Sequence, residues 1–380
     1  MTLNMDSTPD FAGLRLEFPT LRRWAYLDIA RKAPTPLCVE AAARDFFNDI
    51  YERAGQKSFS MEAVEDTRAA LAGLLEVPSR TLAFVKNTSE GLNLAVQAIE
   101  LEPGDNIVTS EFEHEAQMFP LQLAVETRGI QLRIARARVG RIAVQDVIDM
   151  MDERTRACAI SYVAFGNGFR FDLPALAVEC RARGIILISD AIQAIGVLAT
   201  PLSEIGADIV VAGAHKALLG LNGTAFLYCR DGIVEQLRPS LVGKHSITSD
   251  RLAPAPLEYR GDARRFEYGN PNFLGIAALG RTVEFIRSIG LEHIEQQIRE
   301  LTDYLIAKAY SRDLAIRTPT DWSERAGIVS FDLRRDSHEV SERLADKHVV
   351  ANVKDGFVRA SVHFYNSHED LDRFIEVVAR

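Results

Sequence analysis

The sequence predicts an α/β protein in which helices cover a mostly parallel sheet, followed by a smaller α+β domain at the C-terminus. Seven short segments rich in Val, Ile, Leu and Phe follow one another from about residue 80. Helix-like segments separate several of them, and this alternation is typical of a parallel sheet that is buried on both faces. The length of 380 residues also exceeds that of one compact domain, which favours one large and one smaller domain.

The strands and helices of the large domain alternate along the chain. The expected strands lie at residues 80–85, 105–110, 130–137, 156–165, 185–190, 207–213 and 223–229. The expected helices between them lie at 89–101, 115–129, 144–153 and 173–184. In the first of these helices Leu92, Ala95 and Ile99 recur at helical spacing. Gly129 and Gly184 follow two of the helices, and glycine commonly ends a helix.

After about residue 275 the pattern changes to that of the smaller α+β domain. Long helical stretches at 275–290 and 292–310 precede strand-like segments at 327–333 and 357–364, which flank a helical segment at 337–347. We therefore expect three parts: an N-terminal segment at 1–28 that packs with the small domain, a large domain at 29–275 and a small domain at 276–380.

The composition excludes several classes of protein. A net charge of −9 without a compensating basic run argues against nucleic acid as a partner. The first residues, MTLNMDSTPDF, have neither the basic nor the apolar stretch of an export signal. No apolar run approaches the roughly 20 residues that cross a bilayer. The four cysteines lack metal-ligand spacing, so we expect a cytoplasmic protein with free thiols and no metal site.

Two of the expected strands end in ionisable residues. Asp190 and Gln193 follow the apolar segment IILISD, while His215 and Lys216 follow ADIVVAG. Ligands of α/β proteins bind beyond the carboxyl ends of the strands. A carboxylate that emerges from a buried sheet needs a cationic or hydrogen-bonding partner, so Asp190 is the least ordinary of these residues.

Two helices are expected to begin at the same edge with polar residues. In FVKNTSEG, Thr88 and Ser89 open a helix whose free N–H groups can bind an anion, although a simple N-cap explains this segment as well. His114 opens the next helix, where a cap or a surface position is the alternative. An anion site, an imidazole, a carboxylate and a lysine suit pyridoxal 5′-phosphate (PLP), whose phosphate, flat ring, ring nitrogen and aldehyde need such partners.

The sequence resembles class V, fold-type I PLP-dependent enzymes, the group of cysteine desulfurases, selenocysteine lyases and isopenicillin N epimerase-like proteins. The resemblance extends from YLDIARKAPTP near residue 26 to YNSHEDLDRFIEVV near the C-terminus. It implies that Lys216 forms the Schiff base with PLP and that Asp190 pairs with the ring nitrogen. The other cofactor ligands that it implies are Gln193 for the ring hydroxyl, His114 stacked on the ring, and Thr88, Ser89 and His215 for the phosphate.

Two further motifs of the resemblance concern the substrate and a second subunit. Arg359 in GFVRAS matches the arginine that holds the substrate α-carboxylate in this family. FEYGNPN resembles the family segment F-E-x-G-T-P-N, which reaches the phosphate of the neighbouring subunit. The resemblance therefore implies a homodimer in which Asn270 contributes to the neighbouring active site.

The sequence departs from the family at several positions. The region before Arg359 contains no cysteine, so a persulfide-forming desulfurase is not expected, and Asn352 stands where that group has a second arginine. Gly213 replaces a phosphate-binding serine, and Phe165 or a neighbour replaces an asparagine near the ring hydroxyl.

The segment DIARKAP carries two cations where small or polar residues are usual in the family. Our hypothesis is that Arg31 or Lys32 binds a second anionic group of the substrate, and plain surface charge is the alternative.

These observations predict a PLP-dependent enzyme that acts on an amino acid through an aldimine and a Cα carbanion. Lys216, Asp190 and His114 are the expected catalytic residues. A β-elimination of the C–S lyase type is the leading expectation because it needs only the lysine and a leaving group. Transamination, racemisation or epimerisation of the isopenicillin N epimerase type are alternatives, and a non-catalytic scaffold with this fold is a further one.

Overall fold

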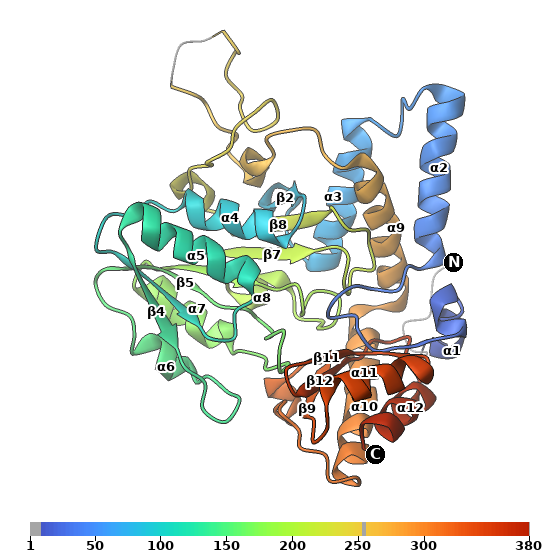
Figure 1. The fold of residues 1–380 in the computed structure, drawn as a ribbon. Helices are drawn as coiled ribbons and strands as arrows, with labels where there is room; N and C mark the ends of the chain where they lie inside the picture. The colour runs from blue at the N-terminus through green and yellow to red at the C-terminus, as the bar shows by residue number, and fades with distance from the viewer. Residues whose placement is uncertain (1–8, 253–255, 380) are drawn as a thin grey trace.

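A seven-stranded sheet forms the centre of the computed structural model, which describes residues 9–252 and 256–379 (Figure 1). In spatial order its strands are β2 (Leu82–Val85), β8 (Ala225–Cys229), β7 (Ile209–Gly213), β6 (Ile186–Asp190), β5 (Thr155–Ala159), β3 (Asn106–Ser110) and β4 (Gln131–Ala135). β8 runs antiparallel to β2 and β7, and the other pairs of the sheet are parallel. The seven expected strands and the mostly parallel sheet are thus confirmed.

Helices cover both faces of this sheet because alternate strand residues point to opposite sides. Ile209 and Val211 of β7 pack with α4 (Thr88–Ala98) and α5 (Glu115–Arg128). Val210 and Ala212 belong to the apolar core of the other face. The helices of that face are α3 (Met61–Leu75), α6 (Val144–Ile148), α7 (Leu173–Ala182), α8 (Leu202–Ile205) and α9 (Phe273–Ile289). α2 (Leu37–Arg53) packs against α9.

Side-chain caps set where the helices at the carboxyl edge of the sheet begin. The side chain of Asn87 accepts a hydrogen bond from Glu90 N at 2.8 Å and starts α4, and Asp172 accepts from Ala175 N at 3.1 Å and starts α7. Gly129 ends α5 with φ at 66°, a backbone conformation that favours glycine. α6 is only five residues long, shorter than the expected 144–153.

A smaller α+β domain lies below the central sheet in Figure 1. Its antiparallel sheet has the order β11 (Asn352–Lys354), β12 (Phe357–Ser361) and β9 (Ile328–Asp332). Its helices are α10 (Leu291–Tyr310), α11 (Ser337–Asp346) and α12 (His368–Val378). Short 3₁₀ turns complete the chain at η1 (Pro19–Arg22), η2 (Ser79–Thr81), η3 (Val234–Gln236), η4 (Ala263–Phe266) and η5 (Trp322–Glu324).

The N-terminal segment joins the small domain. β1 (Ala25–Tyr26) pairs with β10 (Val349–Val350), and Leu27 lies in the core of the small domain. α1 (Phe11–Arg15) is held there by an ion pair of 2.7 Å between Arg15 and Asp370. The part of the expected segment at residues 1–8 lies outside the described residues.

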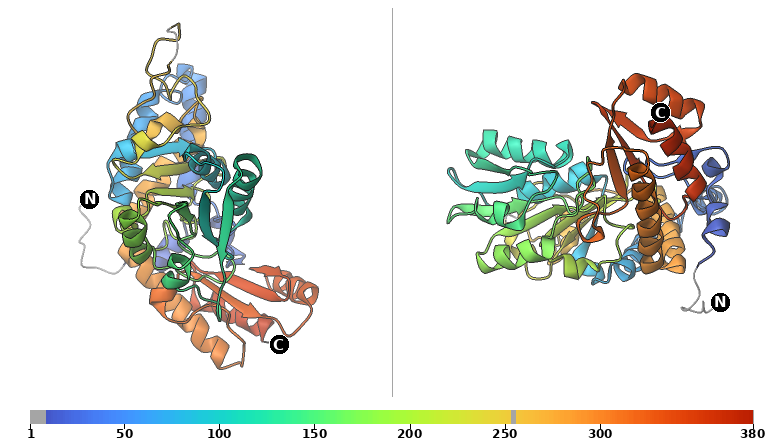
Figure 2. Two further views of the ribbon diagram at one scale, coloured as in Figure 1. Left: turned by 90° about the vertical axis from the view of Figure 1, so that its left-hand side faces the viewer. Right: turned by 90° about the horizontal axis from the view of Figure 1, so that it is seen from below.

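The boundary between the two domains differs from the expected position. Residues 275 and 276 lie inside α9, which packs against α2 and α3 of the large domain. The chain turns at Gly290, between α9 and α10, and α10 then packs against α12 (Figure 2). The helical pattern of the sequence did not place the domain boundary between α9 and α10, because both helices are amphipathic and each buries its apolar face.

Candidate active site

Residues from several elements meet beyond the carboxyl edge of the central sheet. Asp190 is the last residue of β6, and its neighbour β7 leads directly to His215 and Lys216. β2 and β3 run in the same direction as these strands and are followed by α4 and α5. The N-termini of both helices, with Thr88 and His114, therefore open at the same edge.

These residues line one cavity of about 480 Å³. Of the candidate site residues, all but Lys32 and Asn270 line it. The lining residues among them are Arg31, Thr88, Ser89, His114, Asp190, Gln193, His215, Lys216 and Arg359. Ser161, Phe165, Asn352 and Lys354 also line it. Residues from both domains, including Ala30 and Arg31 near the start of the large domain, thus enclose a single hollow.

Lys216 is the most strongly perturbed amine of this cavity. Burial, aided by the charge of Arg359 and opposed by the charges of Asp190 and Asp28, lowers the pKa of Lys216 to about 8. A large fraction of the side chain is therefore uncharged near pH 8. An uncharged amine is the form that attacks an aldehyde.

Asp190 is buried at the far end of the strand that lies beside β7. Ile192 N donates a hydrogen bond to its Oδ1 at 3.0 Å. Burial raises the pKa of Asp190, whereas this hydrogen bond and the charges of Lys216 and His114 favour the carboxylate. Such a carboxylate is suited to a cationic group in the cavity, as the protonated ring nitrogen of PLP is.

The N-terminus of α4 and His215 form the polar wall of the cavity. The hydroxyl Oγ1 of Thr88 is buried and has no hydrogen-bond partner within the described residues. Burial, together with the charge of Lys216, lowers the pKa of His215 to about 4, so its imidazole is neutral and can donate one hydrogen bond. An unused hydroxyl beside free helix N–H groups fits a phosphate group.

A side chain at position 213, such as the serine that the resemblance implies, would require His215 or Ile192 to shift by a few tenths of an ångström. A β-carbon at this position lies 3.0 Å from the His215 ring and 3.0 Å from Ile192 Cδ1. Glycine therefore allows the imidazole to pack closely over the end of β7, and the hydroxyl of the family is absent.

Arg359 is buried rather than part of a surface salt bridge. Its Nη2 donates to Asp28 Oδ1 at 3.2 Å and its Nη1 donates to the carbonyl of Phe165 at 2.6 Å. Its Nε is buried and has no hydrogen-bond partner within the described residues. Two donors thus fix the guanidinium and at least one donor remains for an anion.

His114 and Gln193 also lie on the wall, each held by a backbone contact. His114 Nδ1 accepts a hydrogen bond from Ala116 N at 3.1 Å, and its ring meets that of Phe165 edge to face at 4.9 Å. Gln193 Nε2 donates to the carbonyl of Ala30 at 2.9 Å, which ties the turn that carries Arg31 to the cavity.

Lys32 does not line the cavity, so of the two cations Arg31 is the one that remains a candidate for binding a second anionic group. The backbone N–H groups of Arg31 and Lys32 both donate to the carbonyl of Asp28, which makes a tight turn. Consecutive side chains of this turn point to different sides. Arg31 lines the cavity, whereas Lys32 lines a separate hollow with Tyr26, whose hydroxyl donates to the carbonyl of Lys32 at 2.9 Å.

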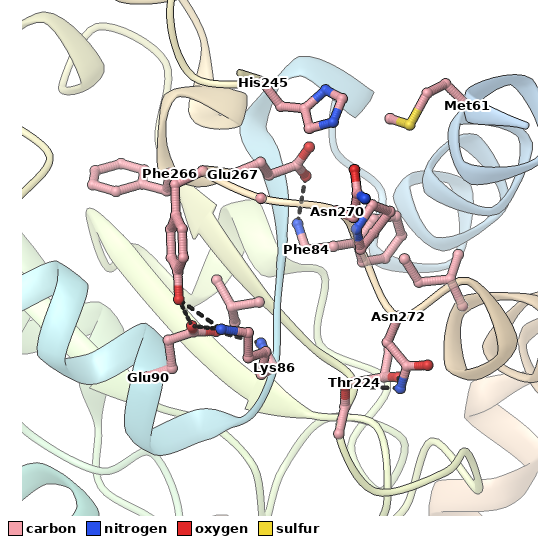
Figure 3. Close-up of a pocket in the computed structure, with 16 residues that line it drawn as sticks. Met61, Phe84, Lys86, Glu90, Thr224, His245, Phe266, Glu267, Asn270 and Asn272 are labelled. Carbon is pink, nitrogen blue, oxygen red and sulfur yellow. Dashed lines mark hydrogen bonds and ion pairs between the residues drawn. The ribbon is translucent and has the colours of Figure 1, made fainter. Parts of the chain in front are cut away.

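Asn270 does not reach this cavity within its own chain. It lines another cavity of about 560 Å³, in which Tyr268 donates to Glu90 Oε1 at 2.5 Å and accepts from Lys86 Nζ at 2.8 Å (Figure 3). Glu267 lies beside it and accepts from Phe84 N at 2.7 Å (Figure 3). Any contact of Asn270 with the Lys216 cavity therefore requires a second copy of the chain.

Three site residues were missed by the sequence reasoning. Asp28 lies in a segment that was examined only for its cations, and it pairs with Arg359 across 331 residues. Glu113 lies buried behind His114 and accepts hydrogen bonds from Ser161 N at 2.9 Å and from Gln117 Nε2 at 2.6 Å. Lys354 looks like an ordinary surface residue in the sequence. Of these three residues, Glu113 is the one that the sequence could have indicated, because it directly precedes the predicted site residue His114.

A buried lysine and a buried carboxylate that face one cavity beyond the carboxyl ends of parallel strands define a fold-type I PLP-dependent enzyme. A family model described as "Aminotransferase class-V" matches residues 25–374. The chain therefore belongs to the class V aminotransferase family, as the resemblance implied. It is a PLP-dependent enzyme of this family, and PLP is its cofactor.

Comparisons with individual proteins agree with this assignment. The chain is 29% identical to a probable cysteine desulfurase of Methanothermobacter thermautotrophicus over 382 residues, which cover 94% of each protein. A cysteine desulfurase of Yersinia pseudotuberculosis is 28% identical over 400 residues, with 97% of each protein covered.

Solved structures have the same fold. The apo cysteine desulfurase from Thermococcus onnurineus NA1 matches with a TM-score of 0.88 and 25% identity, over 98% of this chain and 97% of the other. The cystine C–S lyase C-DES, in complex with its reaction product cysteine persulfide, matches with a TM-score of 0.88 over 95% of this chain and 99% of the other. At 19% identity, the second match shows the fold alone. Within residues 9–252 and 256–379, no helix has both the length and the apolar character of a membrane span.

Proposed function

We propose that this enzyme breaks a C–S bond at Cβ of an amino acid by β-elimination, without a cysteine nucleophile. The observation that carries the proposal is the composition of the cavity. Its lining includes Lys216, Asp190 and Arg359 but no cysteine among the described residues. β-Elimination needs a base at Cα and a leaving group at Cβ, so it loses nothing by the lack of a thiol. Relatives named cysteine desulfurase support chemistry at a C–S bond.

Lys216 is the proposed base. With PLP bound, its Nζ would hold the cofactor aldehyde carbon, and once the substrate amine is in place the same Nζ would accept the proton from Cα. PLP, when bound, supplies a ring that withdraws the electron pair left at Cα. The thiolate then departs with the bonding pair of the Cβ–S bond. Addition of water to the remaining unsaturated amine gives pyruvate and ammonia.

In the proposed reaction, Arg359 positions the substrate and Asp190 keeps the cofactor ring protonated. Arg359, already fixed by Asp28 and Phe165, binds the substrate α-carboxylate with its remaining donor capacity. Asp190 keeps a proton on the cofactor ring nitrogen, which its buried carboxylate favours. Thr88, Ser89 and His215 would hold the phosphate, Gln193 would hold the ring hydroxyl, and His114 would contact the ring.

We further propose a homodimer in which Asn270 reaches the phosphate in the neighbouring subunit. The described residues between η3 and η4, 237–252 and 256–262, support this proposal because parts of them project from the body of the protein (Figures 1 and 2). They expose Leu241, Val242 and Leu252, and exposed apolar side chains favour a contact surface. Light scattering should give twice the mass of the chain, and Asn270→Ala should weaken PLP binding without dissociating the dimer.

The first test of the proposed function is the absorption spectrum of the purified protein with PLP. We expect a cofactor band that borohydride abolishes and that Lys216→Ala changes. Lys32→Ala is the matched control, because it removes a lysine that does not line the cavity. A protein that PLP cannot convert into this coloured form would contradict the proposal and favour a non-catalytic scaffold.

The products distinguish β-elimination from the other reactions of a Cα carbanion. Incubation with S-substituted cysteines should release pyruvate, ammonia and thiol in equal amounts. Turnover that depends on an added keto acid would instead indicate an aminotransferase. Loss of optical rotation without ammonia release would indicate a racemase or epimerase.

A further inference from the structure

Two cations of the Lys216 cavity have no part in the reaction described so far. Arg31 and Lys354 both line the cavity, and both are exposed to solvent. The Arg31 side chain has no ion-pair partner within the described part of the chain. Lys354 Nζ lies 3.7 Å from Asp355 Oδ2, in a pair whose side chains are 67% and 76% exposed. Such a loose pair costs little to exchange for another anion.

Lys354 lies on the same face of the small sheet as Arg359, the proposed ligand of the substrate α-carboxylate. Asn352 of β11 is paired with Arg359 of β12 across the small sheet. Because side chains alternate along a strand, Lys354 lies on the same face as Asn352 and about 7 Å further along β11. Arg359, Asn352 and Lys354 thus form a row that leads from the buried arginine to the mouth of the cavity.

Arg31 lines the same cavity as Arg359 and comes from the turn that follows Asp28. Its turn is held by the carbonyl of Asp28 and by the hydrogen bond from Gln193 to Ala30. The charge of Arg31 helps to lower the pKa of Asp28, against the larger effect of burial, so the guanidinium lies near the Asp28–Arg359 pair. Arg31 and Lys354 therefore approach the substrate position from two different chain segments.

The charges that line the cavity do not balance on this side. PLP and the substrate α-carboxylate use Lys216, Asp190 and Arg359 in the proposed function. Glu115, which lies 3.3 Å from His114 Nε2 at the start of α5, is the other carboxylate of the lining, while Asp28 and Asp355 lie beside Arg359 and Lys354 outside it. Among the residues that line the cavity, cations thus outnumber carboxylates.

We propose that Arg31 and Lys354 bind a second anionic group, at the end of the substrate side chain. The substrate class is then an S-substituted cysteine whose leaving group carries a carboxylate or another anion. This inference rests on the proposed function and specifies its substrate. For S-carboxymethyl-L-cysteine, loss of the Cα proton and of the Cβ–S bonding pair, followed by addition of water, gives mercaptoacetate, pyruvate and ammonia.

The test compares S-carboxymethyl-L-cysteine with its neutral isostere S-carbamoylmethyl-L-cysteine. Both are titrated into the PLP-loaded protein while the cofactor band is followed, and kcat/KM is measured from pyruvate release. The pairs L-aspartate with L-asparagine and L-glutamate with L-glutamine extend the titration to ligands without a thiolate leaving group. We expect the intact enzyme to bind the acid about tenfold more tightly than the isostere.

Three variants locate that preference. Arg31→Ala and Lys354→Ala should each lower the ratio of acid to amide affinity by about threefold to tenfold, with affinity for the amide unchanged. Lys32→Ala, which removes the neighbouring charge outside the cavity, should keep the ratio of the unaltered enzyme. All three should bind PLP as tightly as the unaltered protein.

Other results would overturn the inference. Equal binding of acid and amide by the intact enzyme, or an unchanged ratio in Arg31→Ala, would remove its basis. Weaker PLP binding in Arg31→Ala would instead make Arg31 a ligand of the cofactor phosphate. If no amino acid of the three pairs alters the cofactor band, the proposed function fails and this inference fails with it. Binding without preference for the acid defeats this inference alone.

Discussion

Two buried arginines, Arg68 and Arg359, show how the same side chain serves structure in one region and a site in another. Arg68 of α3 donates to Glu65, to Glu267 and to the carbonyl of Leu82, so all of its nitrogens are bonded. Arg359 leaves Nε without a partner and has one carboxylate, Asp28.

The two environments shift the pKa of the guanidinium in opposite directions. Burial lowers the pKa of both side chains, but two carboxylates outweigh burial at Arg68 and raise its pKa. At Arg359 burial outweighs Asp28, and its pKa is lowered. A saturated pair stabilises the fold, whereas an unsaturated one keeps binding capacity for a ligand. Substitutions should therefore affect stability at one position and activity at the other.

The largest effect is expected for Arg359→Gln. Loss of the guanidinium should lower kcat/KM for the amino-acid substrate about a hundredfold to a thousandfold, because a buried charge contact to the carboxylate disappears. PLP affinity should stay within about threefold, since Thr88, His215 and Lys216 are untouched. Steady-state kinetics and a PLP titration check both statements. Parallel loss of PLP binding would mean that Arg359 shapes the cofactor site and not the substrate site.

Arg68→Met should show the reverse pattern. It breaks the buried pair with Glu267, while Glu65 keeps Arg264 at 3.8 Å, so the free energy of unfolding should fall by about 3–5 kcal/mol. The kcat/KM of the protein that remains folded should fall far less than in Arg359→Gln, because Arg68, Glu65 and Glu267 do not line the Lys216 cavity, although Glu267 lines the cavity of Asn270. Chemical denaturation and kinetics of the same preparation measure both quantities.

Arg80→Ala is the matched control for this effect. Arg80 pairs with Asp231 at 2.6 Å, but both side chains are more than half exposed. Its removal should change the free energy of unfolding by less than about 1 kcal/mol. A loss at Arg80 as large as that at Arg68 would show that burial is not what separates the two pairs.

Glu113 extends the comparison to a buried carboxylate at the site. Burial raises the pKa of Glu113 to about 7, although hydrogen bonds from Ser110 and Ser161 oppose the shift. A raised pKa means that the folded protein binds more protons than the unfolded one between about pH 4.5 and 7. The contribution of Glu113 is therefore fully present below about pH 4.5 and is lost as the pH rises through 7.

Glu113→Gln should remove this pH dependence. In the unaltered protein the free energy of unfolding should decline between pH 5 and 8 by on the order of 3 kcal/mol more than in the variant. Denaturation curves at several pH values test the difference. Parallel pH profiles would contradict a buried, protonated Glu113.

The smallest effect concerns the rate at which the apo protein binds PLP. Only uncharged Lys216 attacks the aldehyde, so the rate constant should rise about tenfold per pH unit and level off above about pH 8. Asp190→Asn removes a charge that raises the pKa of Lys216, and the midpoint should move to lower pH. Absorbance after rapid mixing measures the rate, and a midpoint near that of free lysine would contradict the burial of this amine.

Periodicity was sufficient to predict the seven strands of the central sheet and four of the helices between them, because β-strands buried on both faces leave long apolar runs, but α2 and α3 were not predicted. It did not reveal β1, β10 and β11, since two or three residues are too few for a period. The location of Lys216 and Asp190 at the ligand-binding edge of the sheet could be predicted, because both residues come at the ends of apolar strands. Their burial and the direction of their pKa shifts required the structure.

The remaining errors concern contacts between distant segments. Arg31 and Lys32 are equivalent in the sequence, and only the turn at Asp28 separates their side chains. The pairing of Asp28 with Arg359 links two segments whose local patterns hold no information about one another. Asn270 belongs to a motif whose expected partner is another chain, so neither the sequence of one chain nor its fold brings it to the cavity.

The ion pair between Asp28 and Arg359 also bears on how the protein is made. A ribosome delivers Asp28 early, but its partner emerges 331 residues later, and the strand that carries Arg359 lies near the end of the chain. Until then the carboxylate has no guanidinium, and the cavity lacks one of its walls. A chain that stops before residue 359 therefore contains Lys216 without Arg359, and under the proposed function it could not hold the α-carboxylate of a substrate.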